Sequence, residues 1–231
     1  MNTRHIVLLD LDDTILDFGH AEKLAIKKTF TEFGIEPSEE NAALYSKINL
    51  SQWQRLERGE ITRSEVLTGR FGILFDALGI EADASAAKEK YEQLLSIGHY
   101  FMSGAEELLE ALYKNYRLFI CSNGTAVVQD GRIKSAGIAP YFEKIFVSEN
   151  MGANKPSREY FEKCFSQIPD FDRDRCIILG DSLSSDIRGG INAGIKTCWF
   201  NHKYAKNTTD TRPDYEINRL SEFEAVLETA F

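Results

Sequence analysis

The sequence predicts an α/β fold, in which a doubly wound parallel sheet carries an inserted all-helical cap. From residue 99 onward, short apolar runs alternate with helix-like segments, as in parallel sheets. The stretch 19–98 has four helical patterns and no convincing strand. Polar residues follow the apolar runs, where a parallel sheet binds its ligands. We therefore expect a core of residues 1–18 and 99–231 and a cap of residues 19–98.

The first strand and the cap helices follow from local patterns. Residues 6–9 are consecutively apolar, as in a strand that is buried on both faces. A helix is expected over 21–33, where apolar residues recur at helical spacing before Gly34. The next three helices have start signals, namely Ser38, the capping box of Thr62 with Glu65, and Asp83.

Beyond the cap, strands and helices are expected to alternate. The predicted strands are 117–121, 144–147, 176–179 and 197–200, with an edge strand at 214–217. A capping box of Ser103 with Glu106 predicts the start of the helix before the first of these strands. The later helices are one that closes at Gly137, then 157–167, 185–193 and one from Ser221. Residues 148–154 are expected to form a polar loop.

Length and charge exclude several classes of partner. The chain has 231 residues, which suits one large domain or a domain with an insertion. Its 36 acidic and 27 basic residues give a formal charge of −9, which argues against a nucleic-acid polymer as partner. The leading apolar run is too short for a signal peptide, and no run approaches the roughly 18 residues that cross a membrane. We expect a cytoplasmic protein with no membrane partner, and the oligomeric state is left open.

Cysteine and histidine residues indicate neither a metal site nor a redox site. The cysteines lack metal-type spacing and are expected to be buried thiols in a reducing cytoplasm: Cys121, Cys164, Cys176 and Cys198. The histidines are scattered along the chain and are assigned no chemistry: His5, His20, His99 and His202.

Three acids follow the first predicted strand. Asp10, Asp12 and Asp13 could form a solvated turn, because aspartate is common where strands end. Their spacing permits a second interpretation, since residues i and i+2 of an extended segment project to the same side. Asp10 and Asp12 would then face one crevice, where a hard metal ion would compensate the cost of burying them. Asp13 is expected to be solvated or to cap a helix.

Polar residues at the other strand ends match this acidic cluster. Ser122 and Asn123 follow the second strand, Lys155 follows the third, and Asp181 with Asp186 follows the fourth. Each group alone is most simply a turn or a helix cap. Because parallel strands end at one edge of the sheet, their joint occurrence predicts a single site.

The strand-end motifs resemble those of a known family. DLDDT at 10–14, SNG at 122–124, KP at 155–156 and GDSLSSD at 180–186 look like the four motifs of the haloacid dehalogenase superfamily of phosphatases. The segment 20–98 resembles the helical cap of that family. The resemblance covers essentially the whole chain and implies its Rossmann-like core. It also implies a phosphatase that forms an aspartyl phosphate and requires Mg²⁺.

The resemblance implies a role for each motif residue. Asp10 would attack phosphorus, Asp12 would be the general acid and base, and Lys155 would supply a fixed positive charge. Mg²⁺ would be held by Asp10, the main-chain carbonyl of Asp12, and Asp181. Phosphoryl oxygens would be bound by Ser122, Asn123 and Lys155. Asp186 would orient metal-bound water or Lys155. Ser122 stands where many relatives have threonine, which keeps the hydroxyl.

Within the superfamily, the pattern is most similar to nucleotidases that act on pyrimidine nucleoside 5'-monophosphates. The partner would then be a small phosphorylated metabolite, with phosphoglycolate or a sugar phosphate as alternative substrates. The residues that could contact it, each with packing or solvation as the alternative, are Trp53, Arg55, Arg58, Arg63, Gln129 and Arg132. A phosphomutase and a non-catalytic binding protein are further alternatives. A 2-haloacid dehalogenase is disfavoured because Asp12 and Asp181 are both present.

Overall fold

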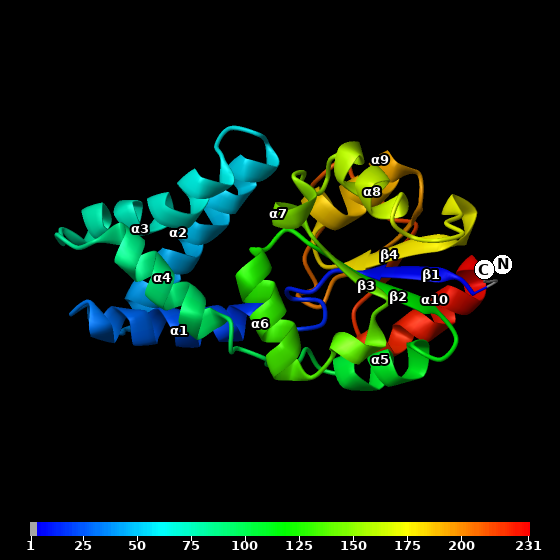
Figure 1. Ribbon diagram of the computed structural model, residues 1–231, viewed down its shortest axis with the longest axis horizontal. Helices are drawn as coiled ribbons and strands as arrows, with labels where there is room; N and C mark the ends of the chain where they lie inside the picture. The colour runs from blue at the N-terminus through cyan, green and yellow to red at the C-terminus, as the bar shows by residue number, and fades with distance from the viewer. Residues whose placement is uncertain (1–3) are drawn as a thin grey trace.

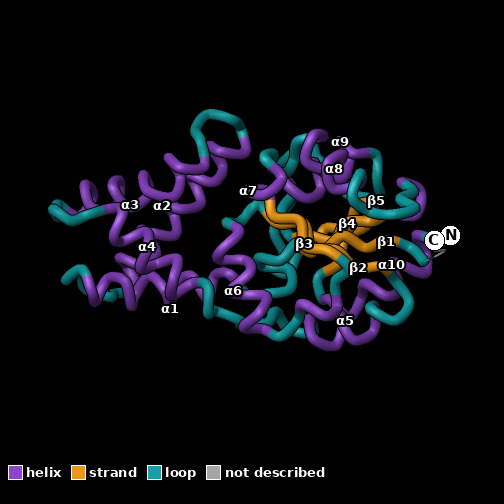
Figure 2. The backbone as a smooth tube through the Cα atoms, viewed as in Figure 1, coloured by secondary structure: helices purple, strands orange, loops and turns teal. Residues whose placement is uncertain are grey.

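The computed structural model describes residues 4–231 and contains a sheet whose strands are all parallel (Figures 1 and 2). The strand order is β3-β2-β1-β4-β5-β6. The strands are β1 (Ile6–Leu9), β2 (Arg117–Ser122), β3 (Lys144–Val147), β4 (Cys176–Gly180), β5 (Lys196–Phe200) and β6 (Tyr215–Ile217). The predicted doubly wound sheet is therefore confirmed.

Strand β1 lies in the middle of the sheet, and its side chains alternate between the two faces. Val7 and Leu9 belong to one hydrophobic cluster, and Ile6 and Leu8 to another. The helices that cover the Val7 face are α5 (Ala105–Leu112), α6 (Ala126–Ala136) and α10 (Phe223–Ala230). The helices on the other face are α8 (Arg158–Phe165) and α9 (Arg188–Ala193).

The strand order reverses direction between β1 and β4. The chain passes from β1 to β2 and β3 on one side, and then from β4 to β5 and β6 on the other. Ligands of open parallel sheets bind at such a switch point, outside the carboxyl ends of the strands. This edge of the sheet is the expected position of the site.

The helices of the expected cap form a separate body beside the sheet (Figures 1 and 2). They are α1 (Phe18–Glu32), α2 (Glu39–Glu57), α3 (Arg63–Leu78) and α4 (Ala84–Leu95). Their apolar faces pack on one another in a hydrophobic cluster that Val128 of α6 also joins. The predicted caps form, with Ser38, Thr62 and Asp83 accepting main-chain hydrogen bonds. The exact domain boundaries, 18/19 and 98/99, stay predictions.

Two local predictions are wrong. Ser103 does not cap α5, because Gly104 occupies the N-cap position with a φ of 82° and no side chain bonds to the helix start. Residues 148–154 are not entirely a loop, since α7 (Ser148–Met151) forms one helical turn that Gly152 ends with a φ of 62°. Glycine tolerates both left-handed conformations without a steric cost. Among residues 4–231, no helix is both long and apolar enough to cross a membrane.

Candidate active site

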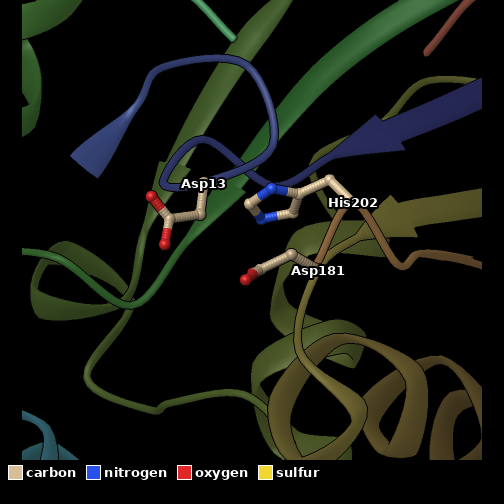
Figure 3. A group of neighbouring side chains, drawn as sticks. All are labelled: Asp13, Asp181 and His202. Atoms are coloured by element: carbon tan, nitrogen blue, oxygen red, sulfur yellow. The ribbon is translucent and has the colours of Figure 1, made fainter. Parts of the chain in front are cut away.

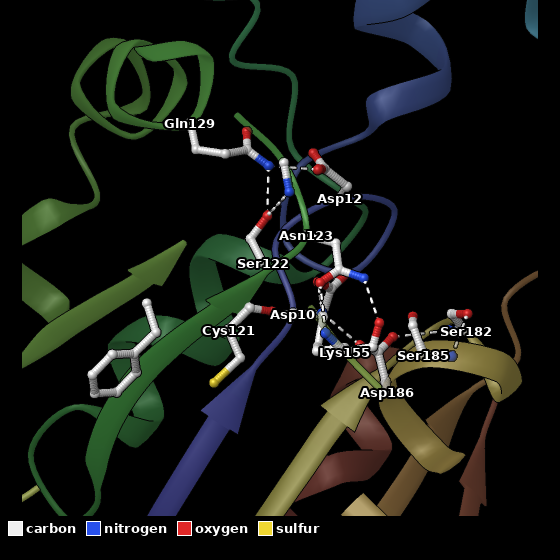
Figure 4. Close-up of polar contacts among 12 residues, drawn as sticks. Asp10, Asp12, Cys121, Ser122, Asn123, Gln129, Lys155, Ser182, Ser185 and Asp186 are labelled. Carbon is white, nitrogen blue, oxygen red and sulfur yellow. Dashed lines mark hydrogen bonds and ion pairs between the residues drawn. The ribbon is translucent and has the colours of Figure 1, made fainter. Parts of the chain in front are cut away.

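Lys155 lies at the centre of the strand ends (Figure 4). Its ammonium donates hydrogen bonds of 2.6 Å to Asp10 Oδ1, to Asp186 Oδ1 and to the carbonyl oxygen of Cys121. Asp10 follows β1, Cys121 lies in β2 and Asp186 follows β4, so three strands position the partners of one buried lysine. The parallel sheet thus brings together residues that are far apart in the sequence.

The negative charges at this site exceed the positive charge of Lys155. Burial and the nearby Asp186 raise the pKa of Asp10 well above its usual value, although Lys155 opposes the shift. Burial, followed by the charges of Asp186 and Asp13, raises the pKa of Asp181 to about 8. For Lys155, burial favours the neutral form, but Asp10 and Asp186 outweigh it and raise the pKa above its usual range. A cation would relieve this crowding of carboxylates.

The residues present fit a hard divalent cation. Carboxylate oxygens of Asp10, Asp181 and Asp186 all lie within 4.8 Å of one another. Oxygen atoms are the ligands that Mg²⁺ prefers in proteins. This group shares Asp10 and Asp181 with the predicted metal ligands, and the Asp186 carboxylate joins them. The side chain of Asp12 is occupied elsewhere, which is compatible with a ligand role for its main-chain carbonyl only.

His202 is a neighbour of the site that the sequence did not indicate. Its ring offers an atom within 4.8 Å of carboxylate oxygens of Asp13 and Asp181, as Figure 3 shows. Burial, together with the charge of Lys203, lowers the pKa of His202. The residue follows β5, which pairs with β4, and only this pairing brings it beside Asp181.

Asp13 binds main-chain nitrogens at the start of α1, close to the capping role that one of its two interpretations predicts, although the N-cap residue itself is Asp17. Asp13 Oδ1 accepts hydrogen bonds from the main-chain nitrogens of Phe18 (2.9 Å) and Gly19 (3.2 Å), the first residues of α1. Its other oxygen pairs with Lys203 at 3.0 Å. The residue adopts a left-handed φ of 56°, which aspartate tolerates better than most residues.

The second motif, residues 122–124, lies at the end of β2 and borders the site there. Ser122 is buried, and its Oγ accepts hydrogen bonds from the main-chain nitrogen of Gly124 (3.1 Å) and from Gln129 Nε2 (2.7 Å). The Asn123 side chain exchanges two hydrogen bonds of 2.9 Å with the main chain of Lys155. Asn123 therefore fixes the loop of the lysine, and its predicted contact with phosphate stays a prediction.

Asp12 is held by two residues of α6. Its Oδ2 accepts a 2.6 Å hydrogen bond from Gln129 Nε2 (Figure 4). Its Oδ1 pairs with Arg132 Nη1. Gln129 lines the cavity above the site. Arg132 is fully buried and bonds to Asp12 and to the Gly98 carbonyl, so of its two interpretations the structure agrees with packing.

A cavity of about 460 Å³ lies between the strand ends and the cap. Its lining includes Asp10, Asp12 and Asp181 from the core, and Trp53 from α2. The other predicted cap contacts are placed elsewhere. Arg55 and Arg58 pair with Glu60, at 3.4 and 2.5 Å.

Arg63 connects the cap to the core. Its Nη1 donates to the carbonyl oxygens of Asn123 (3.0 Å) and Gly124 (2.8 Å), and its Nη2 donates to Ser148 Oγ (2.5 Å) and Asn154 Oδ1 (2.6 Å). The guanidinium thereby binds both loops that carry the second and third motifs. No local sequence signal identifies this contact, because its partners lie in loops far along the chain.

A polar chain lines the cap wall of the cavity, and each cap helix contributes to it. Asn49 donates to Glu22 Oε1 at 2.7 Å and accepts from Arg70 Nη1 at 2.9 Å. Ser46 donates to the other oxygen of Glu22, and Arg70 pairs with Glu92 at 3.6 Å. We refer to these residues as the cap polar chain. Helical periodicity in the sequence did not single them out.

The sequence model of the haloacid dehalogenase-like hydrolases matches residues 7–200. The chain is 40% identical over 227 residues to the HAD-hydrolase YfnB of Bacillus subtilis, covering 98% of this chain and 97% of that protein. It is 36% identical over 212 residues to the pyrimidine 5'-nucleotidase PynA of Streptococcus pneumoniae, covering 91% and 90%. The crystal structure of YfnB bound to magnesium, which reveals an interdomain movement, superposes with a TM-score of 0.92 over 98% of this chain and 99% of that one, at 39% identity.

Proposed function

The chain belongs to the haloacid dehalogenase-like hydrolase family, and on this premise we propose that it is a Mg²⁺-dependent phosphatase of nucleoside 5'-monophosphates, pyrimidine ones above all. The observation that carries the proposal is the buried contact of Lys155 with Asp10 and Asp186 beneath the cavity. A carboxylate beside a fixed positive charge is suited to attack an anionic phosphate. The similarity to PynA supports the choice of substrate class.

Asp10 is the proposed nucleophile. One of its carboxylate oxygens bonds to phosphorus while the bond between phosphorus and the ester oxygen breaks, which leaves an acyl phosphate on Asp10. Lys155 lies 2.6 Å from Asp10 Oδ1 and reduces the repulsion between carboxylate and phosphate. The Ser122 hydroxyl is the proposed ligand of a phosphoryl oxygen, and Gly124 and Gln129 hold it in position.

Asp12 is the proposed general acid and base. It gives its proton to the ester oxygen as that oxygen leaves, and the alcohol departs. A water molecule then attacks phosphorus in the acyl phosphate, and its proton passes to Asp12. Inorganic phosphate leaves and the Asp10 carboxylate is restored, so the enzyme returns to its starting state.

The proposed Mg²⁺ ligands are Asp10 and Asp181, with Asp186 beside them. When bound, the ion supplies positive charge to the phosphoryl oxygens. Asp186 also accepts a hydrogen bond from Lys155, which fits a role in orienting the lysine.

The cavity supports a substrate that is larger than a phosphate with a short chain. Its volume of about 460 Å³ falls within the usual range for small-molecule sites. Trp53 lines it and offers an aromatic face for a base. The cap polar chain presents hydroxyl, amide and carboxyl groups for a base or a ribose.

Phosphate release measures this function directly. With Mg²⁺ present, we expect faster release from pyrimidine nucleoside 5'-monophosphates than from phosphoglycolate or sugar phosphates, and EDTA should stop it. Asp10→Asn should lower kcat by about 10⁴-fold or more while the circular dichroism spectrum stays unchanged. Release by Asp10→Asn at the wild-type rate would exclude Asp10 as nucleophile. An isomerised phosphate ester as product would favour a mutase instead.

A further inference from the structure

Arg132 touches the proposed acid and both connections between core and cap. Its Nη1 pairs with Asp12 Oδ1, and its Nε donates a 3.0 Å hydrogen bond to the carbonyl oxygen of Gly98. Its guanidinium carbon lies 5.7 Å from the centre of the Phe18 ring. Phe18 begins the first cap helix and Gly98 follows the last one. The Arg132 side chain therefore contacts both ends of the cap.

The backbone around Arg132 leaves little room for independent movement. A Cβ atom on Gly131 would lie 2.8 Å from both Cβ and the carbonyl oxygen of Ser96, and one on Gly98 would lie 2.9 Å from Ala21 Cβ. Helix α6 is therefore packed directly on the end of the cap, and the connection at Gly98 packs on helix α1. A displacement of the cap must change the position of the Gly98 carbonyl relative to α6.

Packing alone does not explain an arginine at this position. The side chain is fully buried, and its Nη2 has no hydrogen-bond partner among residues 4–231. A buried guanidinium is costly unless it is paired, and an apolar side chain would fill the same space. The charged partner of Arg132 is Asp12, whose other oxygen is held by Gln129, one turn earlier on α6. Both carboxylate oxygens of Asp12 are thus fixed by this helix.

We propose that Arg132 is a positioning residue that couples the cap to Asp12. The Gly98 carbonyl and the Phe18 ring hold the guanidinium, and the guanidinium holds Asp12 where it can protonate the leaving oxygen. The cap then aligns the acid in addition to covering the cavity. This inference rests on the proposed function, in which Asp12 donates that proton.

Substrates with different leaving groups test the inference. A nucleoside 5'-monophosphate releases an alkoxide that needs a proton, whereas p-nitrophenyl phosphate releases a stable phenolate that needs none. Arg132→Lys keeps the charge but has one nitrogen in place of Nε and Nη1, the two nitrogens that bond separately to the Gly98 carbonyl and to Asp12. We expect its kcat/KM for the nucleotide, which covers only the steps up to release of the alcohol, to fall by about 100-fold, and its kcat/KM for p-nitrophenyl phosphate by less than about threefold. The kcat values would not separate the two substrates, because the water step that follows uses Asp12 for both. The ratio of the two kcat/KM values does not depend on how much of the protein is folded.

Two further variants complete the experiment. Arg117→Lys changes another buried arginine, which pairs with Glu143 away from the site, and should leave the ratio unchanged. In an Asp12→Asn background, Arg132→Lys should lower the nucleotide rate no further. If Arg132→Lys does not fold, Arg132→Gln should give the same split.

Equal losses on both substrates, or an additional loss in the Asp12→Asn background, would overturn the positioning role and leave the proposed function intact. If the wild-type protein releases phosphate from neither substrate, both proposals fail.

Discussion

At the scale of single residues, the site brings three buried or half-buried carboxyl groups together beside one lysine. Lys155 neutralises part of the charge of Asp10 and Asp186, and Asp181 lies beside them without a bond to the lysine in this arrangement. Burial is the largest cause of the rise in the pKa of Asp181, and the neighbouring carboxylates add to it. Proton binding and metal binding at Asp181 therefore compete.

This competition predicts how stability depends on pH. The pKa of Asp181 rises from 3.8 to about 8 on folding, so between about pH 4 and pH 8 the folded protein keeps a proton that the unfolded chain has lost. In EDTA, this group makes the free energy of unfolding fall as pH rises through that window. Asp181→Asn removes the effect, so the Tm of the variant should exceed that of the wild type by an amount that grows with pH and is at least about 4 °C near pH 8.

Differential scanning calorimetry at pH 4, 6 and 8 checks this prediction. A difference in Tm that is the same at all three pH values would show that the pKa of Asp181 is not raised. Adding Mg²⁺ should stabilise the wild type more than the variant, because the ion binds the folded state.

Residues at the strand ends could be predicted from the sequence, because parallel strands carry them to one edge regardless of the details of packing. Asp10, Ser122, Lys155 and Asp181 are found there. For Arg132 the sequence left both substrate contact and packing open, because its direction depends on how α6 is rotated against the sheet. The sequence does not contain that rotation in any local pattern.

At the scale of elements, capping signals in the sequence predicted some helix starts correctly and one wrongly. Thr62 and Glu65 form their capping box within a single turn of α3. Ser103 had the same spacing to Glu106, yet the left-handed Gly104 starts α5. A capping box identifies a helix start only when the backbone of the following residue continues into the helix.

Because α6 packs tightly on the cap, replacing Gly131 with alanine should have an unusual effect on the free energy of unfolding. Gly→Ala inside a helix ordinarily stabilises it by about 0.5–1 kcal/mol. Gly72→Ala in α3 should do so, because nothing lies within 4 Å of the added Cβ. Gly131→Ala should instead lower the free energy of unfolding by about 1–3 kcal/mol, because its Cβ would meet Ser96 at 2.8 Å. Urea denaturation compares the two, and equal stabilisation would mean that α6 is not tightly packed there.

At the scale of the whole molecule, few contacts span the cavity between cap and core. Arg63 bonds to the loops of the second and third motifs, and Glu57 accepts a 2.9 Å hydrogen bond from Ser184. These contacts hold the cap over the site. Their loss should favour positions in which the cap is further from the sheet.

Arg63→Ala tests this connection. Hydrogen bonds from a charged donor contribute about 1.5–3 kcal/mol, so we expect KM for the nucleotide to rise about tenfold or more. Small-angle scattering should show a larger radius of gyration. Arg58→Ala is the matched control, because Arg58 pairs with Glu60 within the cap. An unchanged KM in Arg63→Ala would show that its contacts do not hold the cap in place.

The charges of the cap polar chain predict which compounds the cavity disfavours. This wall holds two carboxyl groups, Glu22 and Glu92, and one guanidinium, that of Arg70, which already pairs with Glu92 and bonds to Asn49. A compound that ends in a second phosphate would bring its distal anion against acidic groups, whereas an uncharged ring would meet hydroxyl and amide partners. The cavity would then select substrates that carry no second anionic group at the end far from the reacting phosphate.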